Sequence, residues 1–231
     1  MPPDLHDTVV PVITIDGPTA SGKGSVAHGV AAILGFHVLD SGALYRLTAL
    51  DAERLGIRLD DEAELAACAL ALAPSFIASR IFMDERDVTD EIRAERIGNL
   101  ASAIAPHPAL RTALLDRQRA FRKAPGLVAD GRDMGTIVFP DAALKVFLVA
   151  DVAARAERRL RQLTERGEAA DLDVLSQELH QRDARDANRK VAPLVAAADA
   201  VTIDSSNLGL DEVIARVLAL ATRAGIAAAS R

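Results

Sequence analysis

The chain has 231 residues and a mass of 24.4 kDa, which suits one α/β domain with an insertion. Half of the residues are hydrophobic, and 27 basic against 33 acidic residues leave a formal charge of −6, which argues against disorder and against a broad surface for nucleic-acid polymers or anionic membranes. A single cysteine, Cys68, excludes an internal disulfide, and no signal-peptide pattern or 18-residue apolar run is present, so we expect a cytoplasmic protein with no membrane span.

The first part of the chain alternates predicted strands and helices. Residues 9–16 form an apolar, β-branched run that is typical of a buried parallel strand, and apolar residues at helical spacing follow over residues 23–34. A short apolar run at residues 36–39 leads into a second helical pattern that ends near Gly56. This order predicts a parallel sheet covered by helices.

The stretch from about residue 60 to 105 interrupts this alternation. A helix is predicted over residues 61–73, and three short strand-like pieces lie between residues 76 and 89. One further helix is expected over residues 90–105. We interpret the segment as an inserted subdomain with a small antiparallel sheet.

The alternation resumes in the second half. A helix is predicted over residues 108–123, and strands are predicted at residues 126–129, 144–149 and 200–203, each followed by a helical pattern. Repeats and flexible linkers are absent from the sequence. The predicted fold is therefore α/β, with a five-stranded parallel sheet flanked by helices in one domain over residues 1–231.

A glycine-rich loop with one lysine follows the first predicted strand and opens the first helix. Its residues, called the P-loop below, are Gly17, Pro18, Thr19, Ala20, Ser21, Gly22, Lys23, Gly24 and Ser25. Such a loop turns backbone N–H groups onto phosphate oxygens, and its lysine reaches the outer phosphates. Because a strand precedes the loop and a helix follows it, we favour this interpretation over a glycine turn with a chance lysine.

Charged residues follow other predicted strands or share a helix face. Asp40 and Asp130 each come directly after an apolar strand, so we expect them to lie with the P-loop along one crevice at the carboxyl edge of the sheet. On a late helix, four charged residues are spaced so that all should lie on one face, with three cations around one acid; they are Arg182, Arg185, Asp186 and Arg189. Solvent-exposed ion pairs would have the same spacing.

Five segments together resemble the bacterial cytidylate kinase family, whose members phosphorylate CMP and dCMP with ATP. They are residues 17–25, 39–46, 129–136, 182–186 and 188–194. The resemblance implies a P-loop kinase core, a monophosphate-binding subdomain over about residues 60–105 and a short lid over about residues 155–172. It also implies Mg²⁺ bound with ATP, and a monomer.

The resemblance further implies roles for individual residues. The P-loop would bind ATP, and the CMP site would consist of Ser41, Arg46, Ser102, Arg111, Arg132, Asp133, Arg182, Asp186 and Arg189. Within that site, arginines would hold the phosphate, Asp186 a sugar hydroxyl, and Ser102, Arg111 and Asp133 the cytosine. The catalytic residues would be Lys23, Arg132, Arg182 and Arg189. The lid arginines would be Arg155, Arg158 and Arg159, and Mg²⁺ would be held by Ser25 and Asp40.

Several alternatives stay open at this stage. The single tyrosine, Tyr45, is left out of the site because a half-buried structural ring explains it equally well. The lid arginines could form a solvated basic helix face. The P-loop alone would also fit a kinase for another small acceptor, a nucleotide-dependent switch or an adaptor with an inert loop. The switch is disfavoured because no Asn-Lys-x-Asp pattern occurs.

Overall fold

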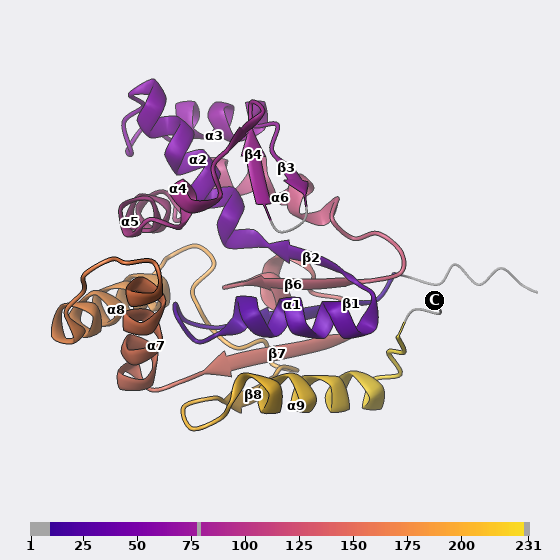
Figure 1. Cartoon of the computed structure of the whole chain (residues 1–231). Helices are drawn as coiled ribbons and strands as arrows, with labels where there is room; N and C mark the ends of the chain where they lie inside the picture. The colour runs from indigo at the N-terminus through magenta and orange to yellow at the C-terminus, as the bar shows by residue number, and fades with distance from the viewer. Residues whose placement is uncertain (1–9, 78–79, 229–231) are drawn as a thin grey trace, which may run out of the picture.

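The fold is described by a computed structural model that covers residues 10–77 and 80–228 (Figure 1). The predicted first strand began at residue 9, which lies outside the described residues. A five-stranded sheet with every neighbouring pair parallel has the order β2-β6-β1-β7-β8. Its strands are β1 (Val12–Asp16), β2 (His37–Asp40), β6 (Leu127–Gly131), β7 (Leu144–Val149) and β8 (Val201–Asp204). The predicted five-stranded parallel sheet is confirmed.

Both faces of the sheet are covered by helices. On one face, α1 (Lys23–Leu34) and α9 (Leu210–Arg223) pack on the apolar side chains of β1, β7 and β8. On the other face lie α2 (Ser41–Leu55) and α6 (Pro108–Arg119). Because helices cover both faces, all five residues of β1 are buried, and three of them, Val12, Ile13 and Ile15, are apolar. In the described residues, no helix has the length and apolar character needed to cross a membrane.

The segment after α2 forms a separate three-stranded antiparallel sheet, as the sequence predicts. Its elements are α3 (Glu62–Ala71), β3 (Ser75–Ile77), β4 (Arg80–Met83), β5 (Arg86–Asp87), α4 (Thr89–Arg93) and α5 (Glu95–Ile104). The third strand is shorter than predicted, because Asp87 accepts hydrogen bonds from the backbone and hydroxyl of Thr89 (2.9 and 2.6 Å) and turns the chain into α4.

The single helix predicted over residues 90–105 is wrong. The chain is extended at Ala94 (φ −58°, ψ 144°), which separates α4 from α5. A guanidinium N–H of Arg46 donates to the carbonyl of Ile92 at 2.7 Å, and this carbonyl is the acceptor that a continuous helix would offer to the N–H of Arg96. The break therefore positions Arg46 between the insertion and the core.

Three further elements complete the carboxyl edge of the sheet. A single π-helical turn, η1 (Met134–Val138), follows β6; the sequence did not predict it. Two helices, α7 (Val152–Glu165) and α8 (Leu172–Ala187), pack on each other through Leu163, Leu175 and Leu179, and lie beside the strand ends (Figure 1). The loops and helices that carry the predicted site residues thus meet at one edge.

Candidate functional site

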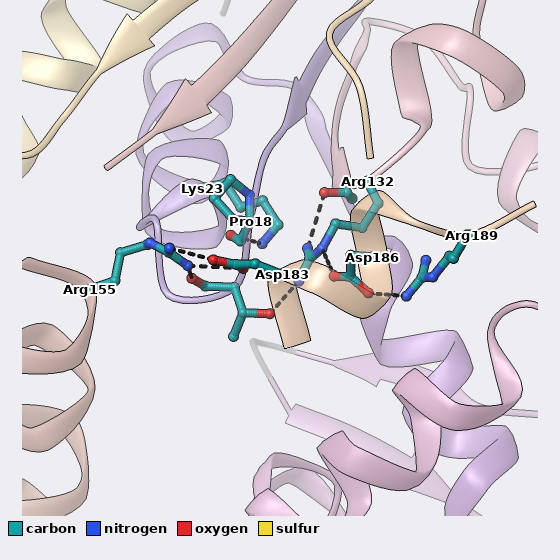
Figure 2. A network of polar contacts seen from close by, with 9 residues as sticks. Pro18, Lys23, Arg132, Arg155, Asp183, Asp186 and Arg189 are labelled. Carbon is teal, nitrogen blue, oxygen red and sulfur yellow. Dashed lines mark hydrogen bonds and ion pairs between the residues drawn. The ribbon is translucent and has the colours of Figure 1, made fainter. Parts of the chain in front are cut away.

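The P-loop is a tight backbone turn between β1 and α1. A β-carbon at Gly17 would lie 2.1 Å from the carbonyl oxygen of Leu148, so only glycine fits there without a shift of the backbone. Ala20 and Gly22 both have positive φ (59° and 92°), which turns the loop inward. The Lys23 ammonium donates to the carbonyl of Pro18 at 3.3 Å (Figure 2). Burial and the nearby Arg132 lower the pKa of Lys23, and a bound phosphate would counter both effects.

All nine residues predicted to bind the acceptor nucleotide line one cavity of about 490 Å³. They come from four helices, the segment just after α8 and the end of β6, and they are Ser41, Arg46, Ser102, Arg111, Arg132, Asp133, Arg182, Asp186 and Arg189. Tyr45, which was left out of the predicted site because a structural ring explained it equally well, lines the same cavity and is buried. Burial raises the pKa of Tyr45 to about 12, so its hydroxyl stays protonated and can donate.

One end of this cavity carries an uncharged hydroxyl and a charged pair. Arg111 forms an ion pair with Asp133, and both side chains are nearly buried. The buried Ser102 hydroxyl has no hydrogen-bond partner within the described part of the chain. Ser41 is fixed by Gln118, whose amide donates to its hydroxyl at 2.9 Å, a contact that the sequence did not indicate. Such polar atoms in a cavity suit the polar edge of a bound base.

The other end of the cavity is built from arginines around one aspartate. Arg132 donates to Asp186 at 2.9 Å, and Arg189 forms an ion pair with the other carboxylate oxygen (Figure 2). Burial acts to raise the pKa of Asp186, but the two arginines outweigh it and hold that pKa below its usual value. Burial lowers the pKa of Arg182 to about 9, and its buried Nε has no partner among the described residues.

A second cavity of about 1120 Å³ adjoins the first and contains the P-loop lysine. Arg46, Arg132 and Arg182 line both cavities, so these three cations stand where the two spaces meet. Lys23, Asp40 and Asp130 line the second cavity and not the first. A phosphoryl group passing between two ligands would lie among these charges.

Asp130 and Asp40 offer carboxylates that suit a divalent cation. Asp130 is buried, its Oδ1 has no hydrogen-bond partner within the described chain, and burial followed by the nearby Asp40 raises its pKa. One oxygen of Asp40 caps α2 by accepting from the Ala43 backbone at 3.0 Å. Ser25 is exposed and lines a different cavity, so the structure does not bring the predicted pair Ser25 and Asp40 together in one cavity.

A third cavity, of about 1190 Å³, lies on the other side of the P-loop. It is bounded by the P-loop residues Ser21, Gly22 and Ser25, by α7 and by the loop after β8. Ser205 and Ser206 of that loop line it, and Arg158 donates to the Ser21 carbonyl at 3.2 Å and to the Ser205 hydroxyl at 3.2 Å. The predicted site did not include these two serines, although their position directly after the last predicted strand could have indicated that they lie near the P-loop.

The three predicted lid arginines occupy three different environments. Arg158 lies against the P-loop and the loop after β8, and Arg159 forms an ion pair with Glu95 on α5. Arg155 is buried and donates to Asp183. The alternative of one solvated basic face is therefore wrong, because each guanidinium has protein acceptors.

Arg185 does not join the acceptor site. Its side chain is exposed and lies outside the acceptor cavity, which contradicts the expectation of three inward-facing cations around Asp186. In a helix with 3.6 residues per turn, Arg185 lies about 60° from Arg182 and about 100° from Asp186, at the edge of the stripe. Arg182 lies on α8, and Arg189 follows the end of that helix at Ala187; both line the acceptor cavity.

Comparison with known proteins identifies the family. Residues 13–223 match the family model described as Cytidylate kinase. The chain belongs to the cytidylate kinase family. Curated relatives named "Cytidylate kinase" include those of Bordetella bronchiseptica, 60% identical over 90% of this chain and 93% of the relative, and Burkholderia pseudomallei, 59% identical over 93% of both. A solved gluconokinase from Sinorhizobium meliloti is 18% identical over 93% of each chain, with a TM-score of 0.48.

Proposed function

We propose that this protein transfers the γ-phosphoryl group of ATP to CMP and dCMP, giving CDP and dCDP. The observation that carries the proposal is the pair of adjoining cavities, one with all nine predicted acceptor residues and one with Lys23, joined by three shared arginines. Membership of the cytidylate kinase family supports the same reaction. ATP is expected to lie along the P-loop, with its γ-phosphate toward the shared arginines.

The reaction needs positioning more than acid–base chemistry. An oxygen of the acceptor phosphate attacks the γ-phosphorus, a new O–P bond forms, and the bond from the γ-phosphorus to the bridging oxygen of ADP breaks. The acceptor phosphate is already ionised, so no general base is required. Lys23, Arg132 and Arg182, which line one cavity, are proposed to neutralise charge on the transferring group and to hold donor and acceptor in line. Arg189, which lines the acceptor cavity but not the cavity around Lys23, would hold the acceptor phosphate.

Recognition of cytosine is assigned to the polar end of the acceptor cavity. A carboxylate accepts from the 4-amino group of cytosine, whereas uracil offers a carbonyl oxygen at that position. Asp133, oriented by its ion pair with Arg111, supplies that carboxylate, and the unpartnered Ser102 hydroxyl is available for another ring atom. Asp186 is proposed to accept from a sugar hydroxyl.

Mg²⁺ is proposed to enter with ATP. The carboxylates of Asp40 and Asp130 line the cavity around Lys23 and are the kind of oxygen ligand that this ion prefers. Asp130 therefore joins the proposed metal site, whereas Ser25 lines a different cavity on the other side of the P-loop. When bound, the ion would draw charge from the β- and γ-phosphate oxygens. The chain's own part is to hold these carboxylates near the phosphates.

Closure, oligomeric state and location complete the proposal. Both nucleotides must be shielded from water, so we propose that the insertion near residues 60–105 and a lid near residues 155–172 close over them. Solution scattering with and without a bisubstrate analogue would show compaction if this is right.

We also propose a monomer that works in the cytoplasm, in line with the single cysteine and the small-molecule substrates.

The experiment that tests the function is ADP production from Mg-ATP with CMP, dCMP, UMP, AMP, GMP and shikimate as acceptors. We expect CMP and dCMP to be strongly preferred. Asp133→Asn should reduce kcat/KM for CMP relative to UMP, because the carboxylate acceptor is lost. Activity with another acceptor alone would contradict the base assignment, and inactivity with all six would contradict the kinase reaction.

A further inference from the structure

Arg155 on α7 links two segments that would bind different substrates. Its Nη1 donates to the carbonyl of Thr19 in the P-loop at 3.1 Å, and its two terminal nitrogens donate to the Asp183 carboxylate on α8 at 3.1 and 2.5 Å (Figure 2). Its Nε donates to the carbonyl of Ala150 at 2.9 Å. Four of its five N–H donors are thus used within the protein, and the side chain is only 4% exposed.

Thr19 is held from two sides by arginines that are both paired with α8. Arg132 donates to the Thr19 hydroxyl at 2.6 Å and to Asp186, while Arg155 donates to the Thr19 carbonyl and to Asp183. The two aspartates lie three positions apart on α8, close to one face. Two Asp–Arg bridges therefore connect one helix to one residue of the phosphate loop.

The contact with the Thr19 carbonyl falls where the loop is most constrained. The next residue, Ala20, has φ +59°, a left-handed conformation that is unfavourable for a residue with a β-carbon. A hydrogen bond to the carbonyl before it fixes the plane of the peptide that joins them. Because the P-loop binds phosphate through its backbone N–H groups, the orientation of that peptide affects the donor site.

The helix that carries Asp183, α8, also contributes to the acceptor site. Arg182 on α8 and Arg189, two residues after the end of α8, line the acceptor cavity, so a bound acceptor phosphate would fix the helix that carries Asp183. Arg155 itself lines none of the three cavities described above, which separates it from an arginine that contacts phosphate directly.

We propose that Arg155, held by Asp183, is a positioning residue that couples occupation of the acceptor cavity to the conformation of the P-loop. CMP binding to α8 then raises the affinity of the P-loop for ATP, and ATP raises the affinity for CMP by the same factor. This inference rests on the function proposed above, because it takes CMP and ATP as the two ligands.

The test is calorimetric binding of the Mg²⁺ complex of a non-hydrolysable ATP analogue, with and without saturating CMP. The ratio of the two Kd values is the coupling factor, which we expect to be about fivefold or more in the wild type. Asp183→Asn and Arg155→Lys should bring the factor close to 1 and leave the Kd for CMP alone within about twofold of wild type. Asp183→Glu keeps the charge and should recover part of the factor.

The matched control is Asp141→Asn, which removes the same charge from an Arg–Asp pair on another part of the surface, with Arg122. Steady-state kinetics give a second readout: with the other substrate saturating, KM for ATP and KM for CMP should both rise in Asp183→Asn by about the lost coupling factor, while the Kd for CMP alone stays near wild type. A general loss of structure would instead lower the melting temperature and also weaken the binding of CMP alone.

A coupling factor that drops in both variants and not in the control supports the proposal. A wild-type factor of 1, or a folded Asp183→Asn with the wild-type factor, overturns it while CMP phosphorylation by the wild type stays intact. If the wild type neither binds nor phosphorylates CMP, the proposed function fails first and the inference fails with it. Should Arg155→Lys not fold, Asp183→Asn decides the question.

Discussion

Replacing Asp186 by asparagine should destabilise the protein strongly, because this buried carboxylate pairs with two largely buried arginines. Its side chain is 1% exposed, while those of Arg132 and Arg189 are 18% and 7% exposed. Each arginine donates to a different oxygen of Asp186. An asparagine keeps one acceptor and replaces the other by an NH₂ donor, so one guanidinium loses its partner and both lose the counter-charge.

Breaking a buried ion pair from one side costs about 3–5 kcal/mol, and the partial exposure of Arg132 favours the lower end. For a domain of this size, 1 kcal/mol corresponds to about 2–4 °C in melting temperature, so about 3 kcal/mol predicts a decrease of about 6–12 °C. Thermal unfolding followed by circular dichroism or calorimetry measures this decrease directly.

The control is again Asp141→Asn, whose carboxylate is 58% exposed beside Arg122. Exposed pairs contribute about 0–1 kcal/mol, which corresponds to a decrease of less than about 4 °C. If Asp186→Asn melted no lower than Asp141→Asn, the account of Asp186 as the counter-charge of the acceptor arginines would be refuted.

Three further predictions concern the loop, the pH dependence and the metal. Gly17→Ala forces a β-carbon against the Leu148 carbonyl, so we expect a loss of about 1–3 kcal/mol in unfolding free energy and a higher KM for ATP; wild-type melting and KM would contradict the steric argument. Burial raises the pKa of Asp16 to about 6 against two backbone hydrogen bonds that lower it. Because the pKa of Asp16 is higher in the folded state than in the unfolded state, the unfolding free energy of the wild type should fall by up to about 3 kcal/mol relative to Asp16→Asn as the pH rises from about 4 to 6. Urea unfolding measures this difference, and a difference that stays constant with pH would show that Asp16 ionises normally. Removing Mg²⁺ with EDTA should abolish transfer and leave CMP binding by calorimetry unchanged, whereas loss of CMP binding would place the ion in the acceptor cavity.

The sheet could be predicted from the sequence because its signals are local. Apolar β-branched runs indicate strands buried on both faces, and Gly35 and Gly56, both at φ 70°, end α1 and α2 where the periodic patterns stop. Two elements were wrong or missed because distant residues decide them. The break at Ala94 depends on Arg46, and the η1 turn has its first N–H groups held by Asp16, which accepts from Met134 and Gly135 at 2.9 and 2.8 Å.

The site could be predicted where motifs follow strand ends, and the rest depends on three-dimensional contacts. Helical spacing predicted that Arg185 shares a face with Arg182 and Arg189, but Arg185 lies at the edge of that face and its side chain is exposed to solvent. The role of Arg155 could not be read from its own helix, because its partners Thr19 and Asp183 lie in the P-loop and on α8. The position of Ser205 after the last predicted strand could have drawn attention to it, but its contact with the P-loop, where its hydroxyl donates to the Ser21 carbonyl at 3.3 Å, requires the fold.

The most direct test of the central claim is to identify the product by ³¹P nuclear magnetic resonance after mixing the protein with Mg-ATP and CMP. The account predicts that CDP and ADP form in equal amounts, and that folded Lys23→Ala is slower by a factor of about 10³ or more while its Kd for CMP is little changed. Consumption of ATP without formation of CDP, or a Lys23→Ala variant as fast as wild type, would contradict it.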